Sequence, residues 1–413
     1  MAVIGDLEAW ARSGAMALTG RADGPPAAAP AGLVTAAAAA AADVASMTSR
    51  IGRAVHVDGP QLLGERAAIA GLTRRGDVSV GGVARFERAS DGWVVLNLPR
   101  PEDVAALPAL VEATIDPDDW TAIRHELTRW SAAELVDRGR LLGLAVARPD
   151  ERPQLAAPGR ELCRGPYRPA PQFPMVLDFS SLWAGPLAGS LLAASGARVI
   201  KIEGRGRLDG ARSGPAAFFD LLNAGKESLV VDFTDRADQA LLRRMVASAD
   251  LVIEASRPRA MTAVGLHPSA VVEDFGTSWV SITGHGRTED PDRVGFGDDA
   301  AVAGGLWLAD GDGPMFVADA VADPLTGLAA AALAAELLAA DRASAVEVPL
   351  SRVAAWAQSR PLDAAVVGGP GRWEVEVGDD RVPVAEPTAR PVRGVAAEPD
   401  ADGVRLRAEF AER

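Results

Sequence analysis

The most constraining feature of the chain is a series of short apolar segments between residues 175 and 283, which alternate with helix-like segments. Apolar runs such as MVLDF, ARVIKIEG and DLVIEAS suit strands that are buried on both faces, and DQALLRRMVASA carries the period of an amphipathic helix. A parallel sheet covered by helices on both sides satisfies both patterns. The sequence therefore predicts an α/β fold: a Rossmann-like, doubly wound parallel sheet domain accompanied by a smaller α+β domain.

Four regions are expected along the chain. Residues 1–150 mix alanine-rich helices with a hairpin-like stretch, VARFERASDGWVVLNL, that turns at Asp91-Gly92, and this mixture indicates the small α+β domain. Residues 151–174 are rich in proline and are interpreted as a linker. Residues 175–360 form the predicted catalytic domain. Residues 361–413 contain one strand-like piece, RWEVEVG, and are expected to wrap around the protein or to be partly mobile.

Composition and charge argue against several classes of protein. The net charge of -14 and the isoelectric point near 4.9 disfavour a nucleic-acid binder. Cys163 is the only cysteine, so an internal disulfide is excluded and a reducing, cytoplasmic setting is expected. The N-terminal residues do not resemble a signal sequence, and the alanine-rich stretches are too weakly hydrophobic to predict a membrane span. No metal site is expected, because the histidines stand at no recognisable metal or triad spacing: His56, His125, His267 and His285.

One acid stands out near the C-terminal end. In VADAVADPLTGLAAAALAAELLAAD, Asp323 directly precedes Pro324 at the start of a helix of alanine and leucine. Aspartate is a favoured N-cap and proline suits the first helical turn, so one interpretation is structural. The other is that this carboxylate acts as a nucleophile. The local pattern fits both.

The stretch from residue 176 to residue 203 combines a strand, a small-residue loop and a helix. This arrangement binds anions in many proteins, because backbone N–H groups and the helix dipole face the ligand. The next strand reaches Glu203, where a Rossmann dehydrogenase holds a ribose. The loop reads AGPLAG instead of GxGxxG, so an NAD-dependent dehydrogenase is disfavoured.

The individual residues of this stretch are more informative than its pattern of strand, loop and helix. VLDFSSLWAGPLAGSLLAASGARVIKIEG resembles the opening of the class III CoA-transferases, the family of formyl-CoA transferase, carnitine CoA-transferase and α-methylacyl-CoA racemase. Further landmarks follow in the family's order, from DLLNAGKESLVVDFTD through GFGDDAAVAGGL and VADAVADPLTGLAAA to VEVPLSRVAAW. The resemblance covers about residues 174–357.

The resemblance implies a CoA-transferase (EC 2.8.3 type) that moves coenzyme A from an acyl-CoA to a carboxylic acid. The family nucleophile matches Asp323, four residues before Gly327, and the loop with Gly295 and Gly297 assists it. The implied intermediates are an aspartyl mixed anhydride and an aspartyl-CoA thioester. CoA thioesters are then substrates, no cofactor is permanently bound, and the partners are an acyl-CoA, a carboxylic acid and a second copy of the chain in a homodimer. No nucleic-acid or membrane partner is expected.

Family CoA contacts carry over to three loops after predicted strands. The implied CoA-binding residues are Leu182, Trp183, Ala184, Val231, Asp232, Phe233, Thr234, Ala255, Ser256 and Arg257. Arg257 suits a phosphate, although a solvated loop charge explains it equally well. Lys226 is expected to be structural or on the surface.

The chain departs from the family pattern in three places. Trp183 stands where formyl-CoA transferase has a glutamine, so formyl and oxalyl substrates are disfavoured. Gly297 stands where the racemase has a histidine and formyl-CoA transferase a glutamate, and the adjacent Asp298 is a possible auxiliary residue. The family's small domain follows the nucleophile helix, whereas here residues 1–150 resemble it and include a faint repeat in which the nucleophile position falls on Thr35 or Ala36.

Two alternative functions therefore accompany the transferase. The first is a CoA- or acyl-CoA-binding protein that has lost catalysis, which Trp183 and the altered domain order favour. The second is an acyl-CoA racemase or isomerase, which the missing histidine at Gly297 disfavours.

Overall fold

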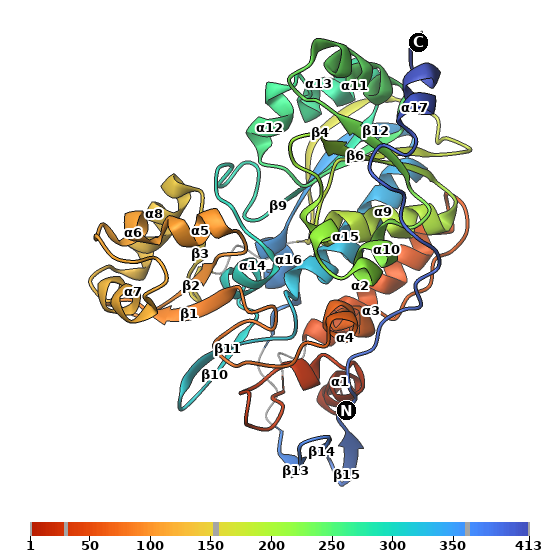
Figure 1. Cartoon of the computed structure of the whole chain (residues 1–413). Coiled ribbons are helices and arrows are strands. Elements are labelled where there is room, and N and C mark those ends of the chain that lie inside the picture. Colours follow the sequence, from red (N-terminus) through yellow and green to blue (C-terminus); the bar gives the residue numbers. More distant parts are fainter. Residues whose placement is uncertain (1, 29–31, 152–156, 360–363, 412–413) are drawn as a thin grey trace.

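The computed structural model describes residues 2–28, 32–151, 157–359 and 364–411. Within these residues, a seven-stranded sheet in the order β4-β12-β9-β8-β5-β6-β7 forms the centre of the molecule (Figure 1). Neighbouring strands run parallel except for β4, which pairs antiparallel with β12 at one edge. The strands are β4 Arg160–Tyr167, β5 Met175–Asp178, β6 Arg198–Gly204, β7 Glu227–Val231, β8 Leu251–Glu254, β9 Ser278–Thr283 and β12 Arg342–Pro349.

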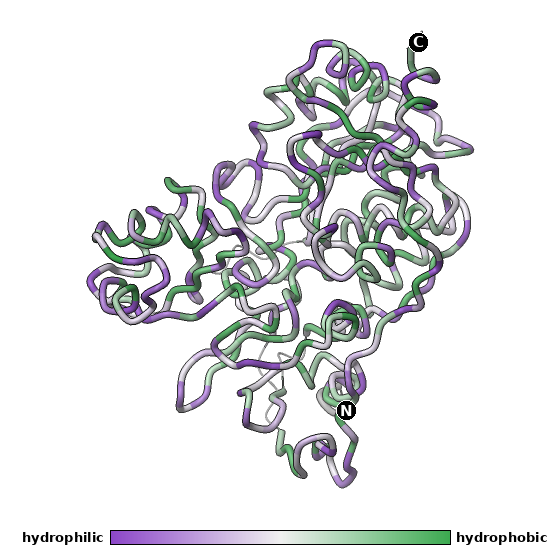
Figure 2. Tube along the Cα trace, viewed as in Figure 1, coloured by the Kyte–Doolittle hydropathy of each residue, from purple (hydrophilic) through white to green (hydrophobic). Residues whose placement is uncertain are grey.

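Helices cover both faces of this sheet, so the predicted doubly wound α/β fold is confirmed. Successive strand residues face opposite cores: Val176 packs with α9 and α15, whereas its neighbour Leu177 packs with α11. Figure 2 shows hydrophobic and hydrophilic stretches alternating along the chain, as this layering requires. The elements around the sheet are α9 Ala184–Ser195, η2 Gly210–Ser213, α10 Ala216–Asn223, α11 Arg236–Ser248, α12 Pro258–Ala263, α13 Pro268–Phe275, α15 Ala322–Ala339 and α16 Leu350–Ala357.

The alanine-rich helix near the N-terminus, α2, packs directly against α15. Alanine side chains allow the close approach, and Ala37 and Ala41 of α2 share one hydrophobic core with Ala330 and Ala334 of α15. The N-terminal residues thus belong to the main core beside the sheet. The elements of this N-terminal part are α1 Ala2–Arg12, η1 Met16–Leu18, α2 Gly32–Thr48, α3 Gly59–Leu62 and α4 Glu65–Ala70.

A separate small unit follows, with a core of its own. Strand β1 pairs with β2, Arg88 faces Trp93 across the turn, and the predicted hairpin is thereby confirmed. Leu96, Leu110 and Ile123 lie in the core of this unit. Its elements are β1 Ala84–Arg88, β2 Trp93–Asn97, α5 Pro101–Ala105, α6 Leu107–Val111, α7 Trp120–Leu127, α8 Ala132–Leu142 and β3 Ala145–Ala147.

Three elements connect this small unit to helix α15. Helix α14 (Gly297–Ala303) packs against β2 and β3, and a hairpin of β10 (Trp307–Asp310) and β11 (Gly313–Phe316) follows it. The Phe316 ring lies 4.5 Å from that of Phe86 in β1. The chain therefore enters α15 along the border between the small unit and the main core.

The proline-rich region before residue 174 contains a strand that the sequence does not predict. Strand β4 forms there because the edge of the sheet offers it the backbone of β12, and Arg160 adds an ion pair to the buried Glu347. An edge strand with one open side needs no continuous apolar run, so periodicity does not reveal it. That residues 151–174 act as a linker between two domains stays a prediction.

The C-terminal part contains β13 (Val366–Gly369), β14 (Arg372–Val377), β15 (Asp380–Pro383) and α17 (Gly403–Glu409). Strand β14 confirms the strand-like RWEVEVG. In Figure 1 the chain then runs from β15 along the molecule to α17 near the other end. It closes the open edge of β7, where Asp400 accepts the N–H of Val230 and Asp402 that of Ser228, both at 2.9 Å.

Helix α15 is long and apolar enough to cross a bilayer by length and composition alone. Within the protein, 67% of it is buried, and a core helix of this kind passes the same test. The expectation that the chain has no membrane partner stays a prediction.

Candidate functional site

Asp323 lies in the first turn of α15, beside the start of α14. The helix begins at Ala322 with Val321 as its N-cap residue, so the predicted N-cap role of Asp323 is wrong. The helix starts earlier than the Asp-Pro pattern suggests because the Ala320 carbonyl already accepts the N–H of Asp323, at 2.8 Å. The Asp323 carboxylate instead accepts a hydrogen bond from the backbone N–H of Gly297.

The contact between Asp323 and Gly297 requires glycine. A Cβ atom at residue 297 would lie 2.3 Å from Oδ2 of Asp323 and 2.5 Å from the carbonyl oxygen of Ala320. Both separations are shorter than a Cβ atom tolerates. Gly297 therefore contributes through its missing side chain, which lets the backbone of α14 reach the carboxylate.

Three buried or half-buried acids gather around one arginine at this point. We call Asp298, Asp319 and Asp323 the acid cluster. Arg66, from α4, binds both carboxylate oxygens of Asp319, with Nε 2.9 Å from Oδ2. Asp298 lies in α14, and its Oδ1 accepts the N–H of Ala320 at 3.1 Å. Three carboxylates therefore share one guanidinium group.

Burial sets the proton affinity of two members of the acid cluster. It raises the pKa of Asp323 to about 7, against the opposing effects of Arg66 and the Gly297 N–H, and the charges of Asp299 and Asp319 raise this pKa further. Burial likewise raises the pKa of Asp298 to about 7. Both carboxyl groups can therefore gain or lose a proton near neutral pH.

Trp183 forms an apolar wall next to the acid cluster. It precedes α9, its side chain is 2% exposed, and its ring meets Phe218 edge to face at 5.2 Å. The Arg66 guanidinium lies 5.1 Å from the Trp183 ring centroid. Among the described residues, no acceptor binds the buried Nε1–H of Trp183. The wall therefore carries one unused hydrogen-bond donor beside the charged groups.

The predicted CoA-binding residues lie at or just after the carboxyl ends of β5, β7 and β8, so they share the carboxyl-terminal side of the sheet. Leu182 is 42% exposed and has φ 71°, and its N–H binds Asp209 at 2.9 Å. Val231 is buried, and its carbonyl oxygen accepts the N–H of Arg205. Leu182 is thus open to a ligand, whereas the Val231 side chain is not.

The other two predicted loops are stabilised from within. Asp232 binds both the N–H and the hydroxyl group of Thr234, and Ser256 donates its hydroxyl to Glu254 at 2.7 Å. The side chains of Thr234 and Ala255 are exposed. These bonds fix the loop shapes, and the CoA contacts there stay predictions.

Arg257 lies in a group of like charges that the sequence does not reveal. Burial lowers its pKa, and the charges of Arg259, Arg100 and Arg207 lower it further. Arg100 is the N-cap residue of α5 in the small unit, whereas Arg207 follows β6 and Arg257 follows β8. We call these four residues the basic group. Arg100 binds Asp103 and Arg259 lies 3.7 Å from Asp292, so the positive charges of the group are partly balanced. The excess of positive charge in a protein of net charge -14 suits an anionic ligand.

Two residues weighed from the sequence are fully occupied by partners. The buried Lys226 Nζ binds Asp178 Oδ2 at 2.8 Å and the Pro186 carbonyl at 2.9 Å, which confirms a structural role. Glu203 binds Arg212 through both carboxylate oxygens and accepts the N–H of Asp209 at 2.8 Å. A ribose would have to compete for Glu203 with Arg212, which weakens the dehydrogenase alternative further.

Sequence reasoning missed three contributors to the site: Arg66, Asp319 and the pair of His285 and Asp299. The Nε2 atom of His285 lies 3.6 Å from Oδ2 of Asp299, and both groups are buried. Asp299 also accepts the side-chain N–H of Asn97, from β2, at 2.7 Å. The described residues contain no group of three or more His, Cys, Asp or Glu that could hold a metal ion.

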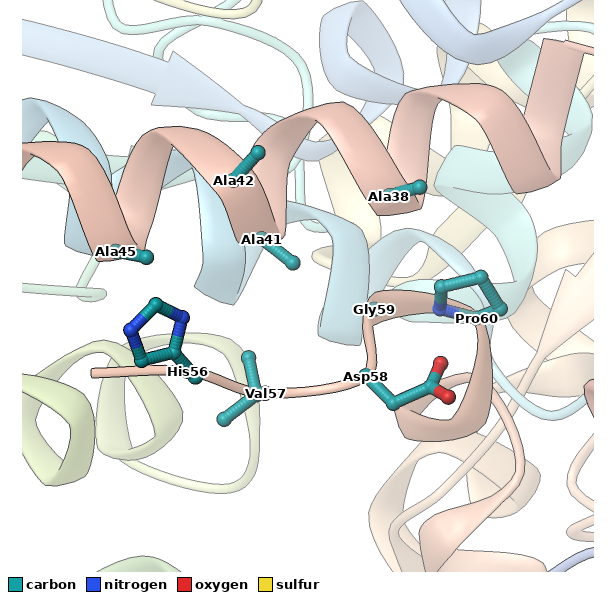
Figure 3. Close-up of a pocket in the computed structure, with 9 residues that line it drawn as sticks. All are labelled: Ala38, Ala41, Ala42, Ala45, His56, Val57, Asp58, Gly59 and Pro60. Carbon is teal, nitrogen blue, oxygen red and sulfur yellow. The ribbon is translucent and has the colours of Figure 1, made fainter. Parts of the chain in front are cut away.

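A cavity of about 350 Å³ lies elsewhere, on the outer side of α2. Figure 3 shows alanines of α2 facing the segment from His56 to Pro60 across it. None of its lining residues belongs to the acid cluster or to the predicted CoA loops. Besides alanines its lining contains His56 and Asp58, and Asp58 already caps α3 by accepting the Gln61 N–H. The site is therefore assigned to the surroundings of Asp323.

Comparison with known proteins places these residues in a family. The model of CoA-transferase family III matches residues 175–387, just over half of the chain. Asp323, Gly297, Asp298 and the predicted CoA loops all lie in the matched part, whereas Arg66 lies outside it.

Two curated relatives illustrate the match. The succinate–glutarate CoA-transferase of Agrobacterium fabrum is 37% identical over 172 residues, which are 37% of this chain and 43% of the relative. The succinyl-CoA–D-citramalate CoA-transferase of Chloroflexus aurantiacus is 32% identical over 140 residues, 32% of this chain and 35% of the relative. The chain thus spans less than half the length of these relatives. A solved structure from Mycobacterium tuberculosis, described as a hypothetical protein, is 31% identical over 46% of this chain and 57% of that one, with a TM-score of 0.41.

Proposed function

Because the chain belongs to CoA-transferase family III, we propose that it transfers CoA from an acyl-CoA to a carboxylic acid, with Asp323 as the nucleophile. The single observation that supports this most is the Asp323 carboxylate at the start of α15, which is held by the Gly297 N–H and lies among groups that bring its pKa to about 7. A half-buried carboxylate with few competing waters is a better nucleophile than one in solution.

In the first half of the proposed reaction, an oxygen of ionised Asp323 attacks the thioester carbonyl carbon. The C–S bond breaks, CoA leaves as a thiolate, and a mixed anhydride joins the acyl group to Asp323. The thiolate then attacks the Asp323 carbonyl carbon of the anhydride. This step forms an aspartyl-CoA thioester and releases the donor's carboxylate.

The second half runs the same steps with the acceptor acid. Its carboxylate attacks the aspartyl-CoA thioester, the thiolate leaves, and a second mixed anhydride forms. The thiolate attacks the acceptor's carbonyl carbon, which gives the new acyl-CoA and restores the Asp323 carboxylate. One thioester is exchanged for another, and no net proton transfer is needed.

The surrounding groups have distinct roles in this proposal. The Gly297 N–H already donates to the Asp323 carboxylate, so it can stabilise the negative oxygen when the Asp323 carbonyl carbon becomes tetrahedral. Arg66 favours the ionised nucleophile by its charge. Asp298, whose pKa also lies at about 7, is the candidate auxiliary acid. The basic group is the candidate contact for CoA phosphates.

A second candidate function has one specific observation in its favour. Trp183 is packed between Phe218 and Arg66, the arginine of the acid cluster, and is only 2% exposed. A protein that binds CoA or acyl-CoA without transfer is consistent with this packing. The racemase alternative finds less support, because Gly297 carries no base and has no room for one.

Trapping the covalent intermediate tests the proposed function. The protein is incubated with a panel of acyl-CoAs, quenched with hydroxylamine or borohydride, and mapped by mass spectrometry. We expect a modified Asp323 in the wild type and none in Asp323→Asn. Asp250→Asn is the control: Asp250 is buried and directly precedes β8, so it lies at the amino-terminal ends of the strands, away from the predicted CoA loops.

Two outcomes would decide between the candidates. An adduct on Asp323 that Asp250→Asn retains supports the transferase. Saturable CoA binding with no adduct from any donor would contradict transfer and favour the binding protein. Light scattering of the same sample tests the proposed homodimer, and cell fractionation tests the expected cytoplasmic location.

A further inference from the structure

The chain takes a strained path just before α15. In the loop formed by residues 318–320, Ala318 has φ 52° and Ala320 has φ 43°. These values lie in the left-handed region, which residues with a Cβ atom rarely adopt. The loop is buried, with Ala318 and Asp319 at 0% exposure. Such a conformation persists only where neighbouring groups impose it.

Each residue of the 318–320 loop is bound by a different side chain. The Thr19 Oγ1 atom accepts the N–H of Ala318 at 3.0 Å. The Asp298 Oδ1 atom accepts the N–H of Ala320 at 3.1 Å. Between them, the Asp319 carboxylate is bound at both oxygens by Arg66. Three consecutive residues are therefore fixed by three separate contacts.

Two of these three side chains come from a segment that the family match does not include. Thr19 and Arg66 lie between residues 16 and 76, whereas the match begins at residue 175. The same segment is fastened to the hairpin before the loop: Arg21 forms an ion pair with Asp310, and the Gly76 carbonyl accepts the N–H of Phe316 at 2.9 Å. Residues 16–76 therefore contact both the 318–320 loop and the hairpin of β10 and β11 that precedes it.

Movement of the 318–320 loop would reach the nucleophile directly. The Ala320 carbonyl accepts the N–H of Asp323 at 2.8 Å. A Cβ atom built at Gly297 would lie 2.5 Å from the same carbonyl oxygen, so Ala320 and Gly297 are in close contact. A displaced Ala320 would therefore shift both the Asp323 carboxylate and the N–H that binds it.

We propose that Thr19 and Arg66 are positioning residues, which hold the 318–320 loop and thereby aim Asp323 at its substrate. The inference rests on the proposed function. Arg66 has a second effect, because its positive charge opposes the acidic groups that face Asp323, namely Asp298 and Asp299 from α14 and Asp319 from the loop.

Thr19 is tested by removing its hydroxyl group in Thr19→Val. Thr48→Val is a closely matched control. Both threonines are fully buried, each donates its hydroxyl to a carbonyl four residues earlier, and each accepts one backbone N–H from another segment, for Thr48 that of Val55 at 2.9 Å. We expect Thr19→Val to lower kcat about tenfold or more with KM for CoA substrates unchanged. Thr48→Val should leave kcat within about twofold, and Thr19→Ser should restore it.

Arg66 is tested by Arg66→Gln, with Arg390→Gln as the control. Arg390 binds both oxygens of the fully buried Glu65, the residue next to Arg66, so its loss disturbs the same helix without touching the acid cluster. We expect Arg66→Gln to lower kcat about 100-fold and to move the acidic limb of the pH–rate profile to higher pH, since Arg66 lowers the pKa of Asp323. Arg390→Gln should change neither kcat nor the acidic limb of the pH–rate profile. Arg66→Lys should bring both partly back to their wild-type values.

Hydrogen exchange of the peptide that contains the 318–320 loop gives a readout that does not need activity. We expect faster exchange there in Thr19→Val and Arg66→Gln, and wild-type exchange in both controls. Equal losses of kcat in test and control variants would overturn the inference, as would unchanged loop exchange. If the wild type forms no adduct on Asp323, the proposed function fails. The exchange data then still decide whether these residues hold the loop: unchanged exchange overturns that part too, and faster exchange supports it.

Discussion

Two buried groups of charges differ in how completely they are paired. Beside β5 and β6, Lys226 pairs with Asp178 and Lys201 pairs with Asp209, each at 2.8 Å, and all four side chains are buried. At the start of α15, Arg66 is the only cation among the described residues that pairs with the three carboxylates of the acid cluster. Both groups lie next to predicted substrate loops, so location alone does not separate their roles.

Charge balance separates them. Burial alone would raise the pKa of Asp178, but Lys226 and Lys201 outweigh burial and hold that pKa below its usual range. In the acid cluster, burial prevails and the pKa of Asp323 rises to about 7. In the paired group the carboxylate of Asp178 stays ionised, although burial lowers the pKa of Lys226 to about 8. An excess of acid instead creates carboxyl groups that titrate near neutral pH.

The largest effect is expected on the unbalanced side, from Asp323→Asn. The amide keeps the size of the side chain but cannot form the anhydride, so transfer should fall about 10⁴-fold or more. Steady-state kinetics with CoA donors measures the loss. Thermal unfolding should show an intact fold, because a buried carboxyl group has been replaced by a neutral one. Residual transfer within tenfold of wild type would contradict a nucleophilic Asp323.

In the paired group beside β5 and β6, Lys226→Met should lower the stability of the fold. It leaves Asp178 buried without its main partner, so the free energy of unfolding should fall by about 3–5 kcal/mol. Urea denaturation measures this change, and the double variant Lys226→Met/Asp178→Asn should recover much of it. A loss below about 1 kcal/mol would show that the pair is not the structural element inferred from its contacts.

Gly297→Ala sharpens the comparison by moving the Asp323 carboxylate without removing a charge. The new Cβ atom would lie 2.3 Å from Oδ2 of Asp323, so the side chain has to shift, and kcat should fall about 10- to 100-fold. Gly369→Ala is the control, because nothing lies within 4 Å of a Cβ atom there. Wild-type kinetics in Gly297→Ala would argue against the Gly297 contact.

The smallest expected effect is on stability as a function of pH. The pKa of Asp323 and that of Asp298 are both raised in the folded protein, to about 7, so the native state binds more protons than the unfolded state between about pH 4 and pH 7. Their contribution is fully present below this window and is lost as the pH rises through it. Melting temperatures across the window should fall less steeply in Asp298→Asn than in the wild type. Identical slopes would contradict the raised pKa of Asp298.

Much of the fold and the centre of the site follow from local sequence. Strands such as β5 and β6 are visible because burial on both faces leaves apolar runs. Asp323 is found because it lies in a family motif, although its position in the helix, in the first turn and two residues after the N-cap, depends on the contact with Ala320.

The rest depends on contacts between distant segments. Arg66 reaches Asp319 across 253 positions of sequence, and Arg100 approaches Arg257 only because the small unit packs beside the sheet. Strand β4 forms by pairing at an edge, which needs no apolar pattern. Sequence alone also does not show that α2 packs on α15, since alanines mark a close contact without naming the partner.

The most direct test of the proposal that Asp323 is a nucleophile tuned by excess acid is the rate of adduct formation on Asp323 as a function of pH in a single turnover. We predict a rate that falls below a midpoint near the pKa of about 7, as the carboxylate takes up a proton. In Asp298→Asn the midpoint should move to lower pH, because one negative neighbour is gone. A midpoint near the ordinary aspartate value of about 4, or an adduct on another residue, would contradict it.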